Sequence, residues 1–234
     1  VFYLQKDDSS PKQTVARLAR EAALIVTDDY PCFIIPEHNR RIADRAEVPV
    51  FVVDSNGVIP MSKFEKEEYA AYTIRPKINR LLDRYLKELD AEAVDVPSLG
   101  LEVDCPQTIV TEDNIPRLVA ECDIDHTVAS SEQYKGGTVA GRERLKKFVD
   151  EILPGYARTR NKPEVDGSSR LSAYLHFGFL SPLEVALAVR DADAPEESKE
   201  AFLEELIVRR ELSLNMTRHN ANYDSLAALP PWVH

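Results

Sequence analysis

Two short, continuous apolar runs shape the first part of the chain. Residues 22–29 and 48–54 are each apolar until they end in aspartate, a pattern typical of parallel strands that are buried on both faces. Residues 37–46 are long enough for a crossover helix between them, so we expect one strand–helix–strand unit. A further helix is expected over 12–20, leading into the first strand. Aspartates at such strand ends either line a ligand site or serve as turn residues, and the second interpretation is the more common.

A long helical stretch is predicted over 64–89, interrupted by Pro76. Proline removes a backbone donor, so we expect it to kink the helix or divide it in two. The residues after the proline form one apolar stripe at helical spacing, made of Ile78, Leu81, Leu82, Tyr85 and Leu89.

The middle of the chain is acidic and has little periodicity. Between Glu88 and Asp125 there are eleven acidic residues and one basic residue, Arg117. With its prolines, the segment from about 90 to 134 reads as an interdomain connection that contains a short helix over 115–121.

The second half is expected to be helical. An amphipathic stripe consists of Leu145, Phe148, Val149, Ile152 and Leu153. Ser181 is suited to cap a helix that starts at Pro182, and Glu184 is placed to bond back to the cap amide. Residues 196–218 are rich in good helix formers and predict another helix.

Composition and charge change this picture only locally. The chain has 234 residues, 44% of them hydrophobic and 29% charged, which is ordinary for a globular protein without a membrane-spanning run. Three cysteines without metal spacing (Cys32, Cys105 and Cys122) favour a reducing, cytoplasmic compartment. Since the first residue is Val1, we expect a processed or partial chain.

The net charge of −11 argues against a polyanionic partner, but residues 135–162 contain eight bases and only three acids. Because phosphates respond to the local field, DNA stays open as a partner; the alternative is a solvated helix face.

The run 161–178 (NKPEVDGSSRLSAYLHFG) has the most chemical content. A hydroxyl-rich turn before a helix presents hydroxyls and backbone N–H groups together, which suits phosphate oxygens. A capped helix start is the alternative. His176 is better explained as a helix residue satisfied locally than as a metal ligand, because no second ligand has suitable spacing.

This run resembles the flavin-cradling segment of photolyases and cryptochromes, and its form SRLSxYLHFG is most similar to the class II branch. Further blocks resemble that branch in the same order: 68–77 (EYAAYTIRPK), Gly136-Gly137 with 145–148 (LKKF), 202–212 (FLEELIVRREL), and 223–225 (YDS) leading to Trp232. The resemblance, to class II cyclobutane pyrimidine dimer DNA photolyases, covers nearly the whole chain.

The resemblance implies a fold and site residues. It implies a partial α/β domain with a Rossmann-like parallel sheet over 1–100, an acidic connection over 101–133, and a partial helical FAD- and DNA-binding domain over 134–234. The residues implied to hold the FAD phosphates and ribityl chain are Tyr156, Ser168, Ser169, Arg170, Leu171 and Ser172. Glu205 would hydrogen-bond the flipped pyrimidine dimer, and the DNA-side residues would be Arg209, Arg210 and Trp232. Glu205 and Arg209, at i and i+4, are spaced for an ion pair; for Trp232 a buried packing role is the alternative.

The implied activity is that of a carbon–carbon lyase acting on UV-damaged DNA. Reduced FAD, excited by light, passes an electron to the dimer, whose ring bonds then break; no metal and no membrane are implied. The alternatives are a cryptochrome-like photoreceptor without repair activity and an inactive remnant. Because such proteins are about twice this length, we also expect the apolar faces of 143–153 and 201–214 to lack packing partners.

Overall fold

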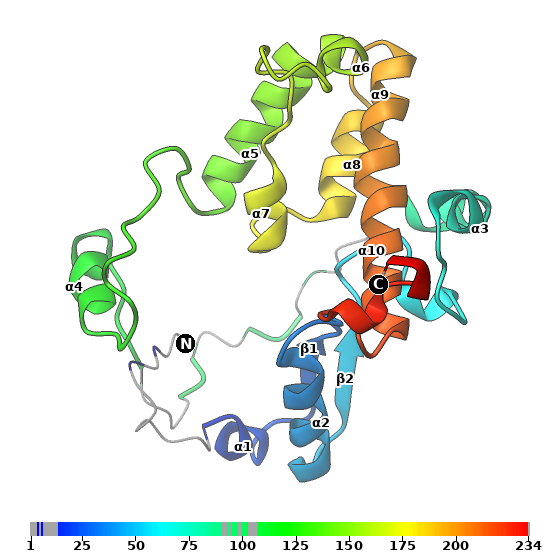
Figure 1. Cartoon of the computed structure of the whole chain (residues 1–234). Coiled ribbons are helices and arrows are strands. Elements are labelled where there is room, and N and C mark those ends of the chain that lie inside the picture. Colours follow the sequence, from blue (N-terminus) through cyan, green and yellow to red (C-terminus); the bar gives the residue numbers. More distant parts are fainter. Residues whose placement is uncertain are drawn as a thin grey trace. The chain divides into compact units, whose positions relative to one another are not determined.

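The structure is a computed structural model that describes residues 4, 6, 14–89, 93, 95–97, 100–102 and 107–233. Its helices are α1 Thr14–Ala19, α2 Ile35–Arg45, α3 Ala71–Tyr85, α4 Ile115–Ala120, α5 Thr138–Lys147, α6 Tyr156–Thr159, α7 Ser172–His176, α8 Pro182–Arg190, α9 Glu196–Leu203 and α10 Arg210–His219, with strands β1 Ile25–Asp28 and β2 Val50–Val53 (Figure 1). Two π-helical segments, Phe148–Ile152 (η3) and Glu204–Arg209 (η5), continue α5 and α9. Lys12, where the first helix was expected to start, lies outside the described residues, as do Val1 and Cys105.

The chain divides into two compact units. The first comprises residues 1–27, 38–51 and 91–134, and the second comprises 28–37, 52–90 and 135–234. Helix α3 therefore belongs to the same unit as the C-terminal helices, and it packs against η5. The boundaries expected at 100 and 134 for the domains of a longer protein stay a prediction.

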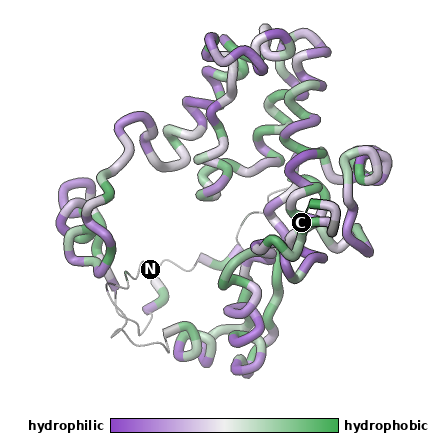
Figure 2. The backbone as a smooth tube through the Cα atoms, in the orientation of Figure 1, coloured by the Kyte–Doolittle hydropathy of each residue, from purple (hydrophilic) through white to green (hydrophobic). Residues whose placement is uncertain are grey.

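The strand–helix–strand unit is confirmed, because α2 connects β1 to β2 within one two-stranded sheet. The backbone N–H of Ile25 donates to Pro49 O and that of Asp29 donates to Val53 O, both at 2.9 Å, so the strands run parallel. The expected burial on both faces is wrong: the side chains of β2 from Phe51 to Val53 are about half exposed, and the strands stand out as hydrophobic in Figure 2. Parallel strands are buried only where helices cover both faces of the sheet, and a single crossover covers little.

Helix α3 is shorter than predicted and is not divided at Pro76. It begins at Ala71, so the proline lies in its second turn and removes only the hydrogen bond to the Tyr72 carbonyl. The apolar stripe is confirmed at Ile78, which is fully buried, but Leu89 lies beyond the end of the helix and is exposed.

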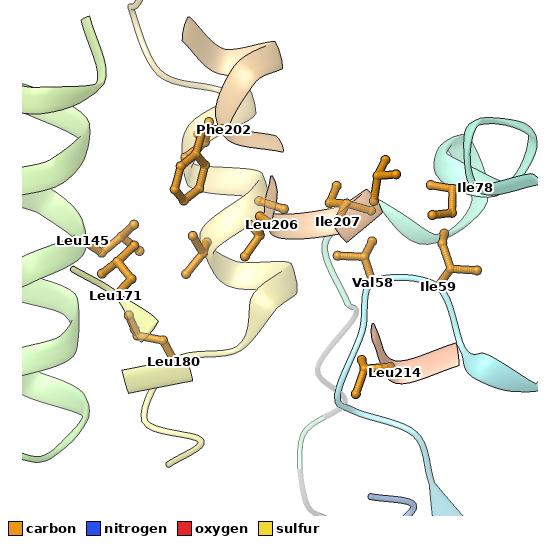
Figure 3. Close-up of a cluster of buried hydrophobic side chains, with 14 of the residues drawn as sticks. Val58, Ile59, Ile78, Leu145, Leu171, Leu180, Phe202, Leu206, Ile207 and Leu214 are labelled. Carbon is orange, nitrogen blue, oxygen red and sulfur yellow. The ribbon is translucent and has the colours of Figure 1, made fainter. Parts of the chain in front are cut away.

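The second unit contains one continuous hydrophobic core. Leu206 and Ile207 of η5 share it with Leu145 of α5, with Ile78 of α3 and with Val58 (Figure 3). The expectation that the apolar faces of 143–153 and 201–214 lack partners is therefore wrong. Helix α3 packs against η5, and Leu145 lies beside Leu171 and Leu180 (Figure 3), a long-range packing that the local pattern does not show.

The capping residues predicted for α8 are confirmed only in part. The Ser181 hydroxyl accepts a hydrogen bond from Leu183 N at 3.2 Å and caps α8, as predicted. Glu184 was expected to reach the cap amide, but its carboxylate instead pairs with Arg142 Nε at 2.7 Å, since an arginine of α5 lies within its reach. The predicted helices over 115–121 and 196–218 are confirmed, the latter as one long run of α9, η5 and α10 (Figure 1).

The first unit is held partly by ion pairs. Glu121, at the end of α4, binds both Lys6 and Arg117. The backbone N–H of Asp123 donates to Lys6 O at 2.8 Å, and the side chain of Leu118 in α4 is buried. Within the described ranges, no helix is long and apolar enough to cross a membrane.

Candidate functional site

The π-helical segment η5 determines which charged side chains meet. The expected ion pair between Glu205 and Arg209 does not form; Arg209 Nε instead lies 3.3 Å from Glu204 Oε1. A π-helix bonds residues five apart, so residues 204 and 209 share a face there, whereas an α-helix would align 205 with 209. The wider turn thus leaves Glu205 for another partner.

That partner is Arg160, whose guanidinium lies 3.1 Å from Glu205 Oε1. The same guanidinium donates to Ala201 O at 2.9 Å, and it lies 5.9 Å from the centre of the Tyr156 ring. Arg160 therefore connects a residue expected to bind flavin with the residue expected to contact the dimer. We did not single it out from the sequence; its i, i+4 spacing from Tyr156 was the only available signal.

Glu204 anchors η5 to α3. Arg75 donates to both of its carboxylate oxygens, with Nε at 3.1 Å and Nη2 at 2.6 Å. The hydrogen bond from Arg75 holds the pKa of Glu204 below its usual value, and Arg209 adds to the effect. Such a bidentate arrangement fixes orientation as well as distance, so it holds the turn that bears Glu205.

Tyr156 lies in the hydrophobic core. Its ring packs edge-on against Phe148 and Phe202, with centroid distances of 5.7 and 5.4 Å. Burial is the main cause that raises the pKa of its hydroxyl. Its ring therefore orders the core under the candidate site, and its expected contact with FAD stays a prediction.

The backbone carbonyls of the serine-rich turn, residues 168–172, are bound by an arginine. Arg144 of α5 donates to the carbonyl oxygens of Ser169, at 2.8 Å, and Ser168, at 3.2 Å. Leu171 is buried and anchors the turn in the core, while Ser168 and Ser172 are exposed. In the part of the chain that the structure describes, neither of these two hydroxyls has a hydrogen-bond partner.

Two backbone features give the turn its shape. Arg170 adopts a left-handed conformation with φ of 55°, uncommon for a non-glycine residue and frequent at binding sites. Its guanidinium pairs with Asp166 at 2.9 Å. Gly167 lies so close to Thr159 that an added Cβ would be only 2.6 Å from its Cβ and Oγ1. The turn therefore needs a glycine directly before its serines.

The expected DNA-side residues have different surroundings. Trp232 is 85% exposed, so the alternative of a buried packing role is wrong; it follows α10 in a short 3₁₀ turn, away from the core contacts. Arg209 is exposed, but Arg210 is half-buried and donates to Asn56 O at 3.0 Å. Burial lowers the pKa of Arg210. Its roles toward DNA, and those of Arg209 and Trp232, stay predictions.

Some of the bases in segment 135–162 pair with acidic neighbours. Arg142, Lys146 and Lys147 pair with Glu184, Asp150 and Glu151, respectively. These pairs are exposed, and a phosphate can replace such partners at small cost. Asp150 and Glu151 are already included in the sequence count of this segment, so of these three pairs only that with Glu184 lowers its positive charge further.

The aspartates at the strand ends act as turn residues. Asp54 accepts hydrogen bonds from the backbone N–H groups of Asn56 and Met61, at 3.2 and 2.7 Å. Asp28 accepts from the Ser55 hydroxyl at 2.8 Å. The described residues contain no cluster of three metal-ligating side chains, and the exposed His176 ring contacts Phe177.

Helix α10 carries buried polar side chains that the sequence did not reveal. Glu211 is fully buried, and its Oε1 accepts from Val58 N at 2.9 Å and Ile59 N at 2.8 Å. One turn later, the fully buried Asn215 accepts from Glu68 N at 2.6 Å. These bonds fasten the chain between β2 and α3 to the helix that follows η5.

The fold is shared with a known photolyase. The structure matches that of a bacterial class III photolyase from Agrobacterium tumefaciens with a TM-score of 0.58, over 90% of this chain and 44% of that chain, at 18% identity. No family model matches the sequence.

The sequence is similar to curated deoxyribodipyrimidine photo-lyases. That of Methanothermobacter thermautotrophicus is 36% identical over 226 residues, covering 96% of this chain and 48% of that protein. Those of Arabidopsis thaliana and Potorous tridactylus are 34% and 31% identical, over 99% and 89% of this chain. The sequence and fold likenesses together support the photolyase family for this chain. The chain spans about half the length of the curated relatives it matches, or less.

Proposed function

We propose that this chain is the part of a class II photolyase that holds the FAD phosphates and places a carboxylate beside a pyrimidine dimer in DNA. The observation that carries the proposal is the 36% identity to a curated photolyase over 96% of the chain. The class II assignment rests on the form of the run from Ser169 to Gly178, which is similar to that branch.

The serine-rich turn fits the phosphates of FAD in its donor chemistry. Ser168 and Ser172 have exposed hydroxyls, and Arg144 occupies the carbonyl oxygens on the other side of the turn. Anionic oxygens need donors, and a turn whose carbonyls are already bound presents donors without competing acceptors. When bound, reduced FAD supplies the light-excited electron that splits the dimer.

Glu205 and Arg160 supply the substrate side of the proposed site. Glu205 is exposed on η5, and Arg160 holds its carboxylate at 3.1 Å. A dimer flipped out of the duplex presents carbonyl oxygens and N–H groups. The Glu205 carboxylate accepts from an N–H, while the guanidinium beside it stabilises negative charge that arrives on the dimer carbonyls.

Two measurements on the purified chain separate the candidate functions. Flavin absorbance of the chain loaded with FAD, compared with a Ser169→Ala/Ser172→Ala variant, distinguishes a flavin-binding chain from an inactive remnant. Preference for a dimer-containing oligonucleotide over an undamaged one, and its loss in Glu205→Gln, distinguishes a photolyase from a cryptochrome-like photoreceptor. A chain that binds FAD but shows no preference for the dimer would contradict the proposal.

A further inference from the structure

Glu211 is a buried carboxyl with only half of its hydrogen-bonding capacity used. None of its surface is exposed, and its Oε1 accepts the N–H groups of Val58 and Ile59. Its Oε2 is buried and has no hydrogen-bond partner among the described residues. Leaving a charged oxygen in that position is far more costly than leaving a neutral hydroxyl, so the geometry favours the protonated acid.

The charges around Glu211 do not compensate for this burial. The N–H groups of Val58 and Ile59 and the charge of Arg210 favour its ionisation, whereas Asp54, which precedes the loop, opposes it. Arg210 is itself engaged by Asn56 O and does not form an ion pair with Glu211 in the structure. Burial is the largest cause and raises the pKa of Glu211 from 4.5 to about 8.

The loop that Glu211 binds is part of the core. Val58 and Ile59 are both buried in the hydrophobic cluster, next to side chains of η5 and α3 (Figure 3). Gly57 permits the close approach: a Cβ there would lie 3.4 Å from Glu211 Oε1 and 3.2 Å from Ile59 O. Losing the two hydrogen bonds to Glu211 would therefore loosen the core.

We propose that Glu211 is a proton-dependent latch: as a neutral acid it stays buried and holds the 57–59 backbone against α10, and once ionised it leaves the core to become hydrated, which releases that segment. The proton lies on Oε2, since Oε1 is occupied as the acceptor of two N–H groups. The latch operates near neutral pH.

The direction of the pH effect follows from proton binding. Between pH 4.5, where an unfolded glutamate loses its proton, and about pH 8, the folded chain holds one proton more. Raising the pH through this window favours unfolding, by about tenfold in the unfolding equilibrium constant per pH unit. The stabilisation by the protonated form is complete below pH 4.5 and is lost by about pH 8.

Urea unfolding of the full chain and of Glu211→Gln at several pH values tests the latch. Glutamine keeps the acceptor oxygen and is neutral at every pH. Between about pH 6 and about pH 8 the unfolding equilibrium constant of the native chain should rise about 50-fold more than that of the variant. Glu200→Gln, at an exposed position of α9, is the matched control and should behave like the native chain. Identical pH profiles for the native chain and Glu211→Gln would overturn the proposal.

A second measurement does not depend on the variant's folding. In the native chain labelled with ¹³C at the glutamate carboxyls, infrared spectroscopy separates protonated acids from carboxylates. A protonated glutamate band should persist at about pH 7 and disappear above about pH 9, in line with the raised pKa of Glu211. A spectrum at about pH 7 that contains only carboxylate bands would equally overturn the proposal.

Discussion

Replacing Gly167 by alanine should displace the serine-rich turn from α6. The new Cβ would lie 2.6 Å from the Thr159 Cβ and Oγ1 and 2.9 Å from the Thr159 carbonyl carbon. Because the last contact is with backbone, a rotation of the threonine side chain cannot relieve it. Ordinary contact begins at 3.4 Å, so the turn must retreat by about 0.8 Å from 2.6 Å.

The size of the effect follows from two opposing contributions. Overpacking costs about 1–3 kcal/mol, while the lower entropy of the unfolded chain with alanine returns about 0.4–1 kcal/mol. We therefore expect Gly167→Ala to destabilise the chain by about 1–2 kcal/mol in urea unfolding and, if the turn holds FAD as proposed, to lower the affinity for FAD.

Gly155→Ala is the matched control for this prediction. Its Cβ would meet only Thr159 Cγ2, at 3.9 Å, an ordinary contact on the same helix. The variant should therefore gain about 0.4–1 kcal/mol of stability from the lower entropy of its unfolded chain, and it should leave FAD binding unchanged. If Gly167→Ala matched this control in both measurements, the close approach to Thr159 would not determine the position of the turn.

Three further predictions concern flavin, core and DNA. Ser169→Ala/Ser172→Ala should reduce the FAD that remains bound after desalting, and unchanged occupancy would exclude the hydroxyls as phosphate donors. Phe148→Ala should lower the free energy of unfolding by about 3–5 kcal/mol, because the ring is fully buried between two others; a loss below about 1 kcal/mol would mean that the core collapses around the gap. If the bases of 135–162 bind DNA, the logarithm of the affinity should fall against that of the salt concentration with a slope of about −0.9 per phosphate contact, whereas a salt-independent affinity would assign them to a solvated face.

Local features were predictable from the sequence. The cap at Ser181 and the stripe through Leu145, Phe148 and Leu153 depend on neighbours within two turns, and the structure confirms them. The short helix predicted over 115–121 is likewise found, as α4. Such elements are stabilised by residues close in sequence, so the pattern contains the necessary information.

What depends on distant residues was not predictable. The pairing of Arg160 with Glu205 requires the packing of α6 against α9, and the burial of Glu211 requires the loop at Val58. The strands of the sheet were expected to be buried because they are apolar, but Phe51 is about half exposed. Apolar character thus predicts a strand without predicting whether other elements pack over it. A charged residue such as Glu211 gives no sign in the sequence of whether a backbone segment elsewhere will bind it.

The π-helical turn of η5 also bears on how the length of this helix can change during evolution. A π turn contains one residue more than the α-helical turn it replaces. The faces of the helices before and after it therefore stay aligned, as they would in an α-helix without that residue. Deleting one residue from an α-helix rotates everything beyond it by about 100°, and would turn Phe202 away from the core that it shares with Leu214. A deletion within 204–209 converts the π turn into an α turn instead and preserves both faces. Homologues with helices one residue shorter at this position can therefore retain the same core, while the partners of Glu204 and Glu205 are exchanged.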